Sequence, residues 1–150
     1  MIRILITAVL YLISFFSQAQ DHKSEESKTV GTQLVNVNTT INQMSSDKGT
    51  VYFALFDSAE NFEQRKFLQV RKVKASENGV HVTFNNVAEG EYAITCFHDE
   101  NDNQTMDFDL DGMPLENYGS SNNVMNFGPP RFDDAKFVVN DKDLTFEIKF

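Results

Sequence analysis

The chain has 150 residues, a length that suits one domain better than two. Its formal net charge is −9, and a negative surface repels phosphate backbones and anionic headgroups, which argues against nucleic-acid and membrane-surface partners and favours cations. The single cysteine, Cys96, excludes an internal disulfide.

Residues 1–19 are predicted to be a cleavable signal peptide. Arg3 supplies a positive start, and the apolar run Ile4–Phe16 is shorter than the roughly 20 residues that span a bilayer. Ser17-Gln18-Ala19 places small residues where a signal peptidase cuts, which predicts cleavage after Ala19. We therefore expect a periplasmic or secreted protein that is not inserted in a membrane after cleavage.

Residues 20–30 are polar and charged without apolar periodicity, which predicts a flexible tether ahead of a single domain over residues 31–150. From there the apolar residues alternate with a period of two, the pattern of β-strands. A first strand is expected around Leu34–Val37, and a central strand, apolar on both faces, over Val51–Phe56. Ser58 follows as the N-cap of one short helical turn.

The next strands alternate with turns. Phe67–Val73 has basic outward positions, as protected edge strands often do. Asn78-Gly79 matches a two-residue hairpin turn in which both residues take positive φ, leading into a strand over Val80–Phe84. Tyr92–Phe97 is again apolar on both faces.

Strand character returns only at Phe137–Val139 and Leu144–Phe150, more than thirty residues later. Seven short strands without a helix long enough for a crossover predict an all-β fold: an antiparallel seven-stranded sandwich, prealbumin-like or immunoglobulin-like, with one long acidic loop.

That loop, residues 99–130, is the candidate functional site, because structureless connections of this length are uncommon in compact domains and usually functional or disordered. Its many apolar residues argue against disorder, and Phe108 and Leu110 are expected to point into the core. It holds seven acids and no Lys or Arg: Asp99, Glu100, Asp102, Asp107, Asp109, Asp111 and Glu116. A hard divalent cation with oxygen ligands would offset their repulsion.

Two overlapping frames of a calcium loop occur here. Asp107-x-Asp109-x-Asp111-Gly112 is the first half of the motif with its turn glycine, although Glu116 comes two residues before the position of the closing Glu. Asp99-x-Asn101-x-Asn103 with Asp107 matches ligand positions 1, 3, 5 and 9, but has Gln104 where glycine belongs and Leu110 where the closing Glu belongs. The first-choice calcium ligands are Asp107, Asp109, Asp111 and Glu116, and the second are Asp99, Asn101 and Asn103.

The alternative is that these side chains only form Asx-turns with the backbone. Zinc is disfavoured, because His98 is the only nitrogen ligand near the loop and Cys96 should point inward. His98 itself is expected to bond backbone, and Cys96 to be buried and unreactive.

Several motifs together resemble a known family. They are Gly90-Glu-Tyr-Ala-Ile, His98-Asp-Glu-Asn, Gly112-Met-Pro-Leu-Glu-Asn-Tyr-Gly119, Ser121-Asn-Asn and Gly128-Pro-Pro-Arg-Phe-Asp-Asp-Ala-Lys-Phe137. The sequence resembles the domain of unknown function 2141 family of exported bacterial proteins, and departs from it at Gln104 and Asn117, where that family has glycine. The resemblance implies an architecture and a site, with no assigned reaction.

No catalytic constellation is recognised, so a non-enzymatic structural or binding role in the cell envelope is expected. The alternatives are a carbohydrate- or peptide-binding module that uses loop aromatics such as Phe108, Tyr118 and Phe127, or a hydrolase that uses the loop carboxylates. The sequence leaves the oligomeric state open.

Overall fold

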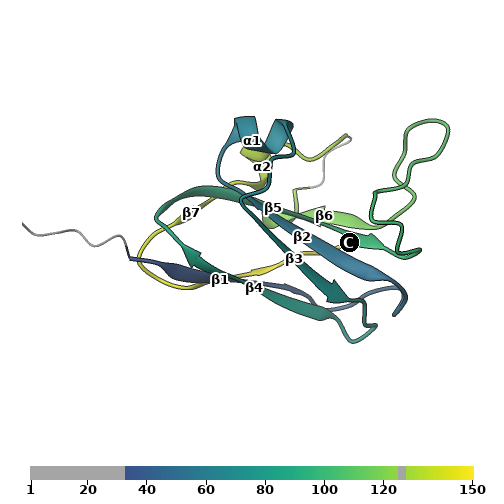
Figure 1. Ribbon diagram of the computed structural model, residues 1–150, viewed down its shortest axis with the longest axis horizontal. Coiled ribbons are helices and arrows are strands. Elements are labelled where there is room, and N and C mark those ends of the chain that lie inside the picture. The colour runs from purple at the N-terminus through teal and green to yellow at the C-terminus, as the bar shows by residue number, and fades with distance from the viewer. Residues whose placement is uncertain (1–32, 125–127) are drawn as a thin grey trace, which may run out of the picture. The chain divides into compact units, whose positions relative to one another are not determined.

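The computed structural model describes residues 33–124 and 128–150, which form a mostly β structure of two sheets (Figure 1). The predicted signal peptide and tether lie outside the described residues. The first sheet has the order β4-β1-β8, built from Val80–Val87, Val35–Ile41 and Leu144–Glu147. In β1 every second side chain is buried, as the alternating sequence predicts for a strand with one face on the core.

The second sheet has the order β3-β2-β5-β6, from Gln69–Lys74, Thr50–Phe56, Gly90–Asp99 and Tyr118–Ser120. The ten-residue β5 also pairs through its first half with β7, Phe137–Val139. Two strands therefore pair with different parts of β5: β7 with Gly90–Tyr92 and β6 with Thr95–Phe97. The acidic loop leaves the end of β5 and returns as β6.

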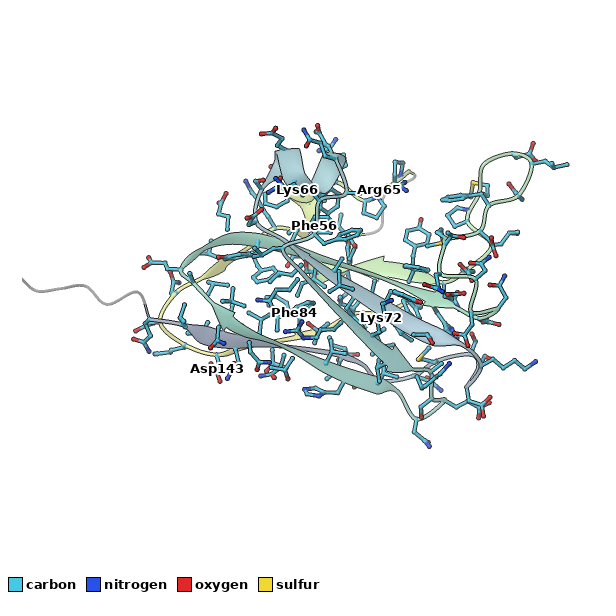
Figure 2. All side chains as sticks on the ribbon, viewed as in Figure 1. Phe56, Arg65, Lys66, Lys72, Phe84 and Asp143 are labelled. Atoms are coloured by element: carbon cyan, nitrogen blue, oxygen red, sulfur yellow. The ribbon has the colours of Figure 1, made fainter. Side chains whose placement is uncertain are left out.

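One hydrophobic core joins the two sheets. Phe84 on β4 and Val37 on β1 belong to the same buried cluster as Phe53 on β2 and Ile94 on β5. Figure 2 shows Phe84 between the sheets. A smaller cluster, Phe56, Ala93, Phe132 and Ala135, lies under the two short helices, α1 (Ala59–Glu63) and α2 (Phe132–Ala135).

Side chains join the sheets where backbone pairing stops. Arg71 on β3 donates from Nε to the Thr83 carbonyl on β4 at 2.8 Å. On the opposite side, Asn123 donates from Nδ2 to the Glu147 carbonyl at 2.7 Å, and its Oδ1 accepts from the Lys149 amide at 2.8 Å. These contacts satisfy backbone groups at strand edges that would otherwise be open.

The structure corrects the expected strand count and pairing. The described residues form eight strands, because Tyr118–Ser120 in the long loop forms β6, which is too short to show alternation and is interrupted by a glycine. The arrangement is also not wholly antiparallel, because β8 runs parallel to β1. The chain crosses from β7 to the other sheet at the end where β1 begins, and Asp143 accepts there from the Asn36 amide at 2.7 Å.

The hairpin expected at Asn78-Gly79 is also wrong. Among the two residues only Gly79 has positive φ, 89°, and β3 and β4 belong to different sheets. The turn is closed by the Gly79 amide bonding to the Ser76 carbonyl at 2.8 Å. A Cβ on Gly79 would lie 2.3 Å from the Ile41 carbonyl oxygen, so close approach to the end of β1 is a further reason for glycine here.

The short helical turn begins as predicted. Ser58 is the N-cap of α1, and its Oγ accepts from the Asn61 amide at 3.2 Å. Over residues 33–124 and 128–150, no helix is long and apolar enough to cross a membrane.

Candidate functional site: the acidic loop between β5 and β6

The acidic loop divides into two parts. Its base holds five oxygen-bearing side chains joined by hydrogen bonds, which we call the base cluster: Asp99, Asn101, Asn103, Asp107 and Glu116. Between Asp107 and Glu116 the chain forms a hairpin, residues 108–115, which we call the finger. Figure 1 shows this segment extending away from the sheets beyond the end of β5.

Asp99 is the buried end of the base cluster. It ends β5 and is fully buried, and its two carboxylate oxygens accept from the Asn103 amide at 3.0 Å and the Gln104 amide at 2.8 Å. Gln104 has φ 70°, a conformation in which glycine is usual. The chain therefore makes the sharp turn that the calcium motif assigns to glycine, although the residue there is Gln.

Asp107 is the centre of the cluster. Its carboxylate accepts from Asn101 Nδ2 at 2.7 Å and from Asn103 Nδ2 at 3.0 Å to each oxygen. The Oδ1 atoms of the two asparagines accept backbone amides instead, from Asn103 and from Thr105. Two neutral amide groups thus lie against the Asp107 carboxylate.

Glu116 ties the two ends of the finger together. One carboxylate oxygen accepts from the Glu100 amide at 3.1 Å, and the other from the Asp107 amide at 3.2 Å. Burial raises the pKa of the Glu116 carboxyl, and the negative charges of Asp99 and Asp107 raise it further, while the two backbone hydrogen bonds act in the opposite direction. The Glu116 carboxylate is therefore close enough to Asp99 and Asp107 to be repelled by their negative charges.

Asp102, a loop acid outside the predicted ligand sets, fixes the loop to the sheet. Its carboxylate accepts from Thr50 Oγ1 at 2.7 Å and from Lys74 Nζ at 2.9 Å. The hydrogen bond from Lys74 holds the pKa of the Asp102 carboxyl below its ordinary value, with Thr50 contributing. Lys74 thus reaches this loop from β3, and it neutralises Asp102 rather than the cluster.

Asp109 and Asp111 lie in the finger, apart from the base cluster. Asp109 Oδ1 accepts from the Asp111 amide at 2.9 Å and from the Met113 amide at 2.7 Å, which is an Asx-turn arrangement. Asp109 and Met113 also bond through their backbones, and Asp111 is exposed at the tip. The structure therefore brings together the second-choice ligands with Asp107 and Glu116, and separates Asp109 and Asp111 from them.

The expected inward orientation of the finger's apolar residues is wrong. Phe108 is 50% exposed, Met113 63% and Leu115 66%, and Leu110 is fully exposed. The backbone bonds from Asp109 to Met113 and from Leu115 to Asp107 close the hairpin on itself, so these side chains have no core to enter. Tyr118 is also partly exposed, and Phe127 lies outside the described residues.

The neighbours of the loop behave as the sequence indicates. His98 is fully buried, and its Nε2 lies 2.6 Å from the Lys48 carbonyl oxygen, so it bonds backbone as expected. Its Nδ1 lies 3.7 Å from Glu100 Oε1. Cys96 is buried within β5, and burial raises the pKa of its thiol far above the ordinary value, which makes it unreactive.

Sequence reasoning missed Gly49 as a residue of this site. Gly49 has φ 73°, and a Cβ there would lie 1.9 Å from the Asp99 carbonyl oxygen. The turn before β2 therefore packs directly on the backbone that carries Asp99. The only sequence signal was a glycine preceding a strand, which indicates a turn but not its partner.

The donor chemistry of the base cluster fits a hard cation, whereas its present arrangement is one of internal hydrogen bonds. All five side chains carry oxygen, the ligand atom of calcium. Across residues 33–124 and 128–150, no three His, Cys, Asp or Glu side chains are grouped closely enough to form a metal site by themselves.

The protein is thus a β-protein of two sheets that share one core. Its distinctive feature is the long acidic connection between β5 and β6. Residues 39–147 match the model of a family described as an uncharacterized protein conserved in bacteria (DUF2141). The chain belongs to this family. No curated protein and no solved structure gives a significant match.

Proposed function

We propose that the protein is an exported, non-enzymatic β-sandwich protein, prealbumin-like or immunoglobulin-like, whose acidic loop is stabilised by calcium. The convergence of Asp99, Asn101, Asn103, Asp107 and Glu116 carries this proposal. Three of the five are carboxylates, and Lys74, which reaches the loop from β3, is bound to Asp102. A divalent cation would neutralise charge that no base of the loop offsets.

The geometry changes the preferred ligands. Asp107 and Glu116 stay in the proposed set, with Asp99, Asn101 and Asn103 in place of Asp109 and Asp111. The Oδ1 atoms of Asn101 and Asn103 accept the backbone amides of Asn103 and Thr105, and an amide oxygen that accepts one N–H keeps a second lone pair for a metal. Calcium would supply charge neutralisation and order to the loop. An export compartment suits such a site, because extracellular calcium sites function at Kd values of about 10⁻⁴–10⁻³ M.

Thermal unfolding tests this proposal. Millimolar calcium is expected to raise the melting temperature of the purified protein, and chelator to reverse the rise. Asp107→Ala should abolish the rise, whereas the matched variant Asp111→Ala in the finger should retain it. Identical melting curves in calcium and in chelator contradict the calcium site, and loss of the rise in Asp111→Ala as well as in Asp107→Ala favours the Asp107–Gly112 frame instead.

Export has its own test. Residues 1–19 are proposed to be a signal peptide, so the protein recovered from its cells should begin at Gln20. Intact-mass measurement decides this, and a mature chain that retains Met1 contradicts it.

A carbohydrate- or peptide-binding role is a second candidate, and one arrangement favours it. Lys72, Tyr52, Phe97 and Tyr118 are cross-strand neighbours in one row across the outer face of the second sheet. Tyr52 and Phe97 stack with ring centroids 5.0 Å apart, which leaves Tyr118 at the exposed end of the row. Saturable binding to a glycan or peptide array that Tyr118→Ala removes supports this role, and an empty array contradicts it.

A further inference from the structure

The finger is an ordered hairpin with apolar side chains turned to water. Two backbone bonds close it, Asp109 N to Met113 O at 2.9 Å and Leu115 N to Asp107 O at 2.9 Å, and the Asp109 carboxylate secures the turn. Exposed apolar groups gathered on one projecting element mark a contact surface more often than scattered ones do. Because the hairpin is already ordered, its docking costs little conformational entropy.

The charges of the finger specify the partner. The finger, residues 108–115, has the sequence FDLDGMPL, with two acids, Asp109 and Asp111, and no base. A surface that fits must therefore combine apolar contacts with positive charge. Residues 65–74, RKFLQVRKVK, carry five bases and no acid, and they include the exposed Phe67, Leu68 and Val70.

Four exposed side chains stand at alternate positions of this basic segment, and we call them the β3 face: Lys66, Leu68, Val70 and Lys72. Val70 and Lys72 are two residues apart on β3 and are both exposed, so they lie on the same side of the strand. Lys72 Nζ lies 4.7 Å from the centre of the Tyr52 ring, which holds its charge over the sheet. Figure 2 labels Lys66 near α1 and Lys72 along the strand.

The finger and the β3 face lie at opposite edges of the second sheet. The order β3-β2-β5-β6 places β3 at one edge and β6, where the finger returns, at the other. Two different complementary surfaces on one chain define a head-to-tail contact, which propagates from copy to copy unless a ring closes.

We propose that the finger of one copy docks on the β3 face of a second copy, with Leu110 and Met113 against Leu68 and Val70 and the finger carboxylates against Lys66 and Lys72. The contact is small beside the roughly 800 Å² that each partner buries in a stable interface, so the association is weak, with a Kd of about 10⁻⁵–10⁻³ M. It does not depend on the calcium site. Since the charges lie at the surface, salt weakens it.

Sedimentation velocity of the purified protein at low ionic strength tests the contact, in buffer with chelator so that no metal bridges carboxylates. The weight-average sedimentation coefficient should rise with protein concentration and fall back in 0.5 M salt. Leu110→Asn with Met113→Asn should weaken association at least tenfold, and Lys66→Glu with Lys72→Glu likewise. All four side chains are exposed, so the variants should fold, and unchanged circular dichroism checks this. Val138→Asn, another exposed apolar position, is the matched control and should associate as the parent does.

Mixing the two defective double variants distinguishes this geometry from a symmetric one. The finger variant keeps an intact β3 face and the β3 variant an intact finger, so an equimolar mixture should form dimers and nothing larger. A monomer at every concentration overturns the proposal. So does self-association that the finger variant leaves unchanged, or a mixture in which no dimer forms.

Discussion

The base cluster and the finger belong to the same acidic loop, yet their side chains differ in burial and in hydrogen bonding. In the base cluster the carboxylates accept from backbone amides and from asparagine side chains, and Asp99 is fully buried. In the finger Asp109 serves the turn, and the large apolar side chains face water. The base is held by β5, β2 and β3, whereas the finger is closed by its own hydrogen bonds.

The acidic residues of the loop therefore do not form one site. A carboxylate can be held in place by a cluster or by a local turn, and sequence spacing alone does not distinguish the two. The base cluster is the proposed cation site, and the finger is the proposed contact surface.

The largest difference in stability between the two regions is expected from substituting one glycine in each. Gly49→Ala places a Cβ 1.9 Å from the Asp99 carbonyl oxygen at φ 73°, so it should destabilise the protein by about 3 kcal/mol. Gly112→Ala in the finger has a similar φ, 81°, and open space around its Cβ, so it should cost only about 1 kcal/mol. Urea unfolding of both variants measures the difference. Equal losses would show that Gly49 does not support the base.

A second effect concerns the return of the loop to the core. Ser121 Oγ is buried, accepts from the Ile94 amide at 3.0 Å and donates to the Ala135 carbonyl. Ser121→Ala leaves both backbone groups without this partner and should cost about 1–3 kcal/mol. Ser76→Ala removes an exposed turn hydroxyl that accepts from the Asn78 amide, and it should change the free energy of unfolding by less than about 0.5 kcal/mol. A neutral Ser121→Ala would mean that the loop is not anchored there.

A smaller effect is expected at the contact between Asp102 and Lys74. Because the pKa of Asp102 is lowered in the folded protein, its ionised form stabilises the fold above the ordinary pKa of about 3.9, and this contribution is lost as the pH falls through the lowered value. Asp102→Asn should therefore lower the melting temperature slightly at pH 7, and the difference from the parent should disappear once the pH lies below the lowered pKa. Lys74→Met should have the same effect, and the double variant should add little to either one. If the two losses add in the double variant, Asp102 and Lys74 do not stabilise the fold through their contact.

The smallest effect is expected at the tip of the finger. Leu110 is fully exposed, so Leu110→Ser should leave the melting temperature of the dilute protein unchanged. A fall of several degrees would show that the finger packs on the domain, and it would remove the contrast with the base.

The strands could largely be predicted from sequence, because burial of one strand face imposes a period of two. Val51–Phe56 and Tyr92–Phe97 are found as the central strands β2 and β5. The strand β6 could not be found, because its pairing is set by β5 across the whole length of the loop. The pairing of β8 with β1 likewise depends on where the chain crosses between the sheets.

The site could be predicted as a segment but not as an arrangement. Spacing correctly indicated that Asp99, Asn101, Asn103 and Asp107 belong to one turn, since they lie within nine residues. It gave the finger an inward orientation because Phe108 and Leu110 alternate with acids, as in a half-buried strand. The hairpin bonds from Asp109 and Leu115 override that pattern. The support from Gly49 involves a contact fifty residues away and has no local signal.

A calcium titration followed residue by residue through backbone amide resonances tests the central claim most directly. Addition of calcium to the chelator-treated protein should shift the amides of residues 99–107 and Glu116 in proportion to one another, while those of Leu110 and Gly112 stay in place. Resonances that do not move at millimolar calcium, or movement confined to residues 107–112, would contradict the division of the loop into a cation-binding base and a projecting finger.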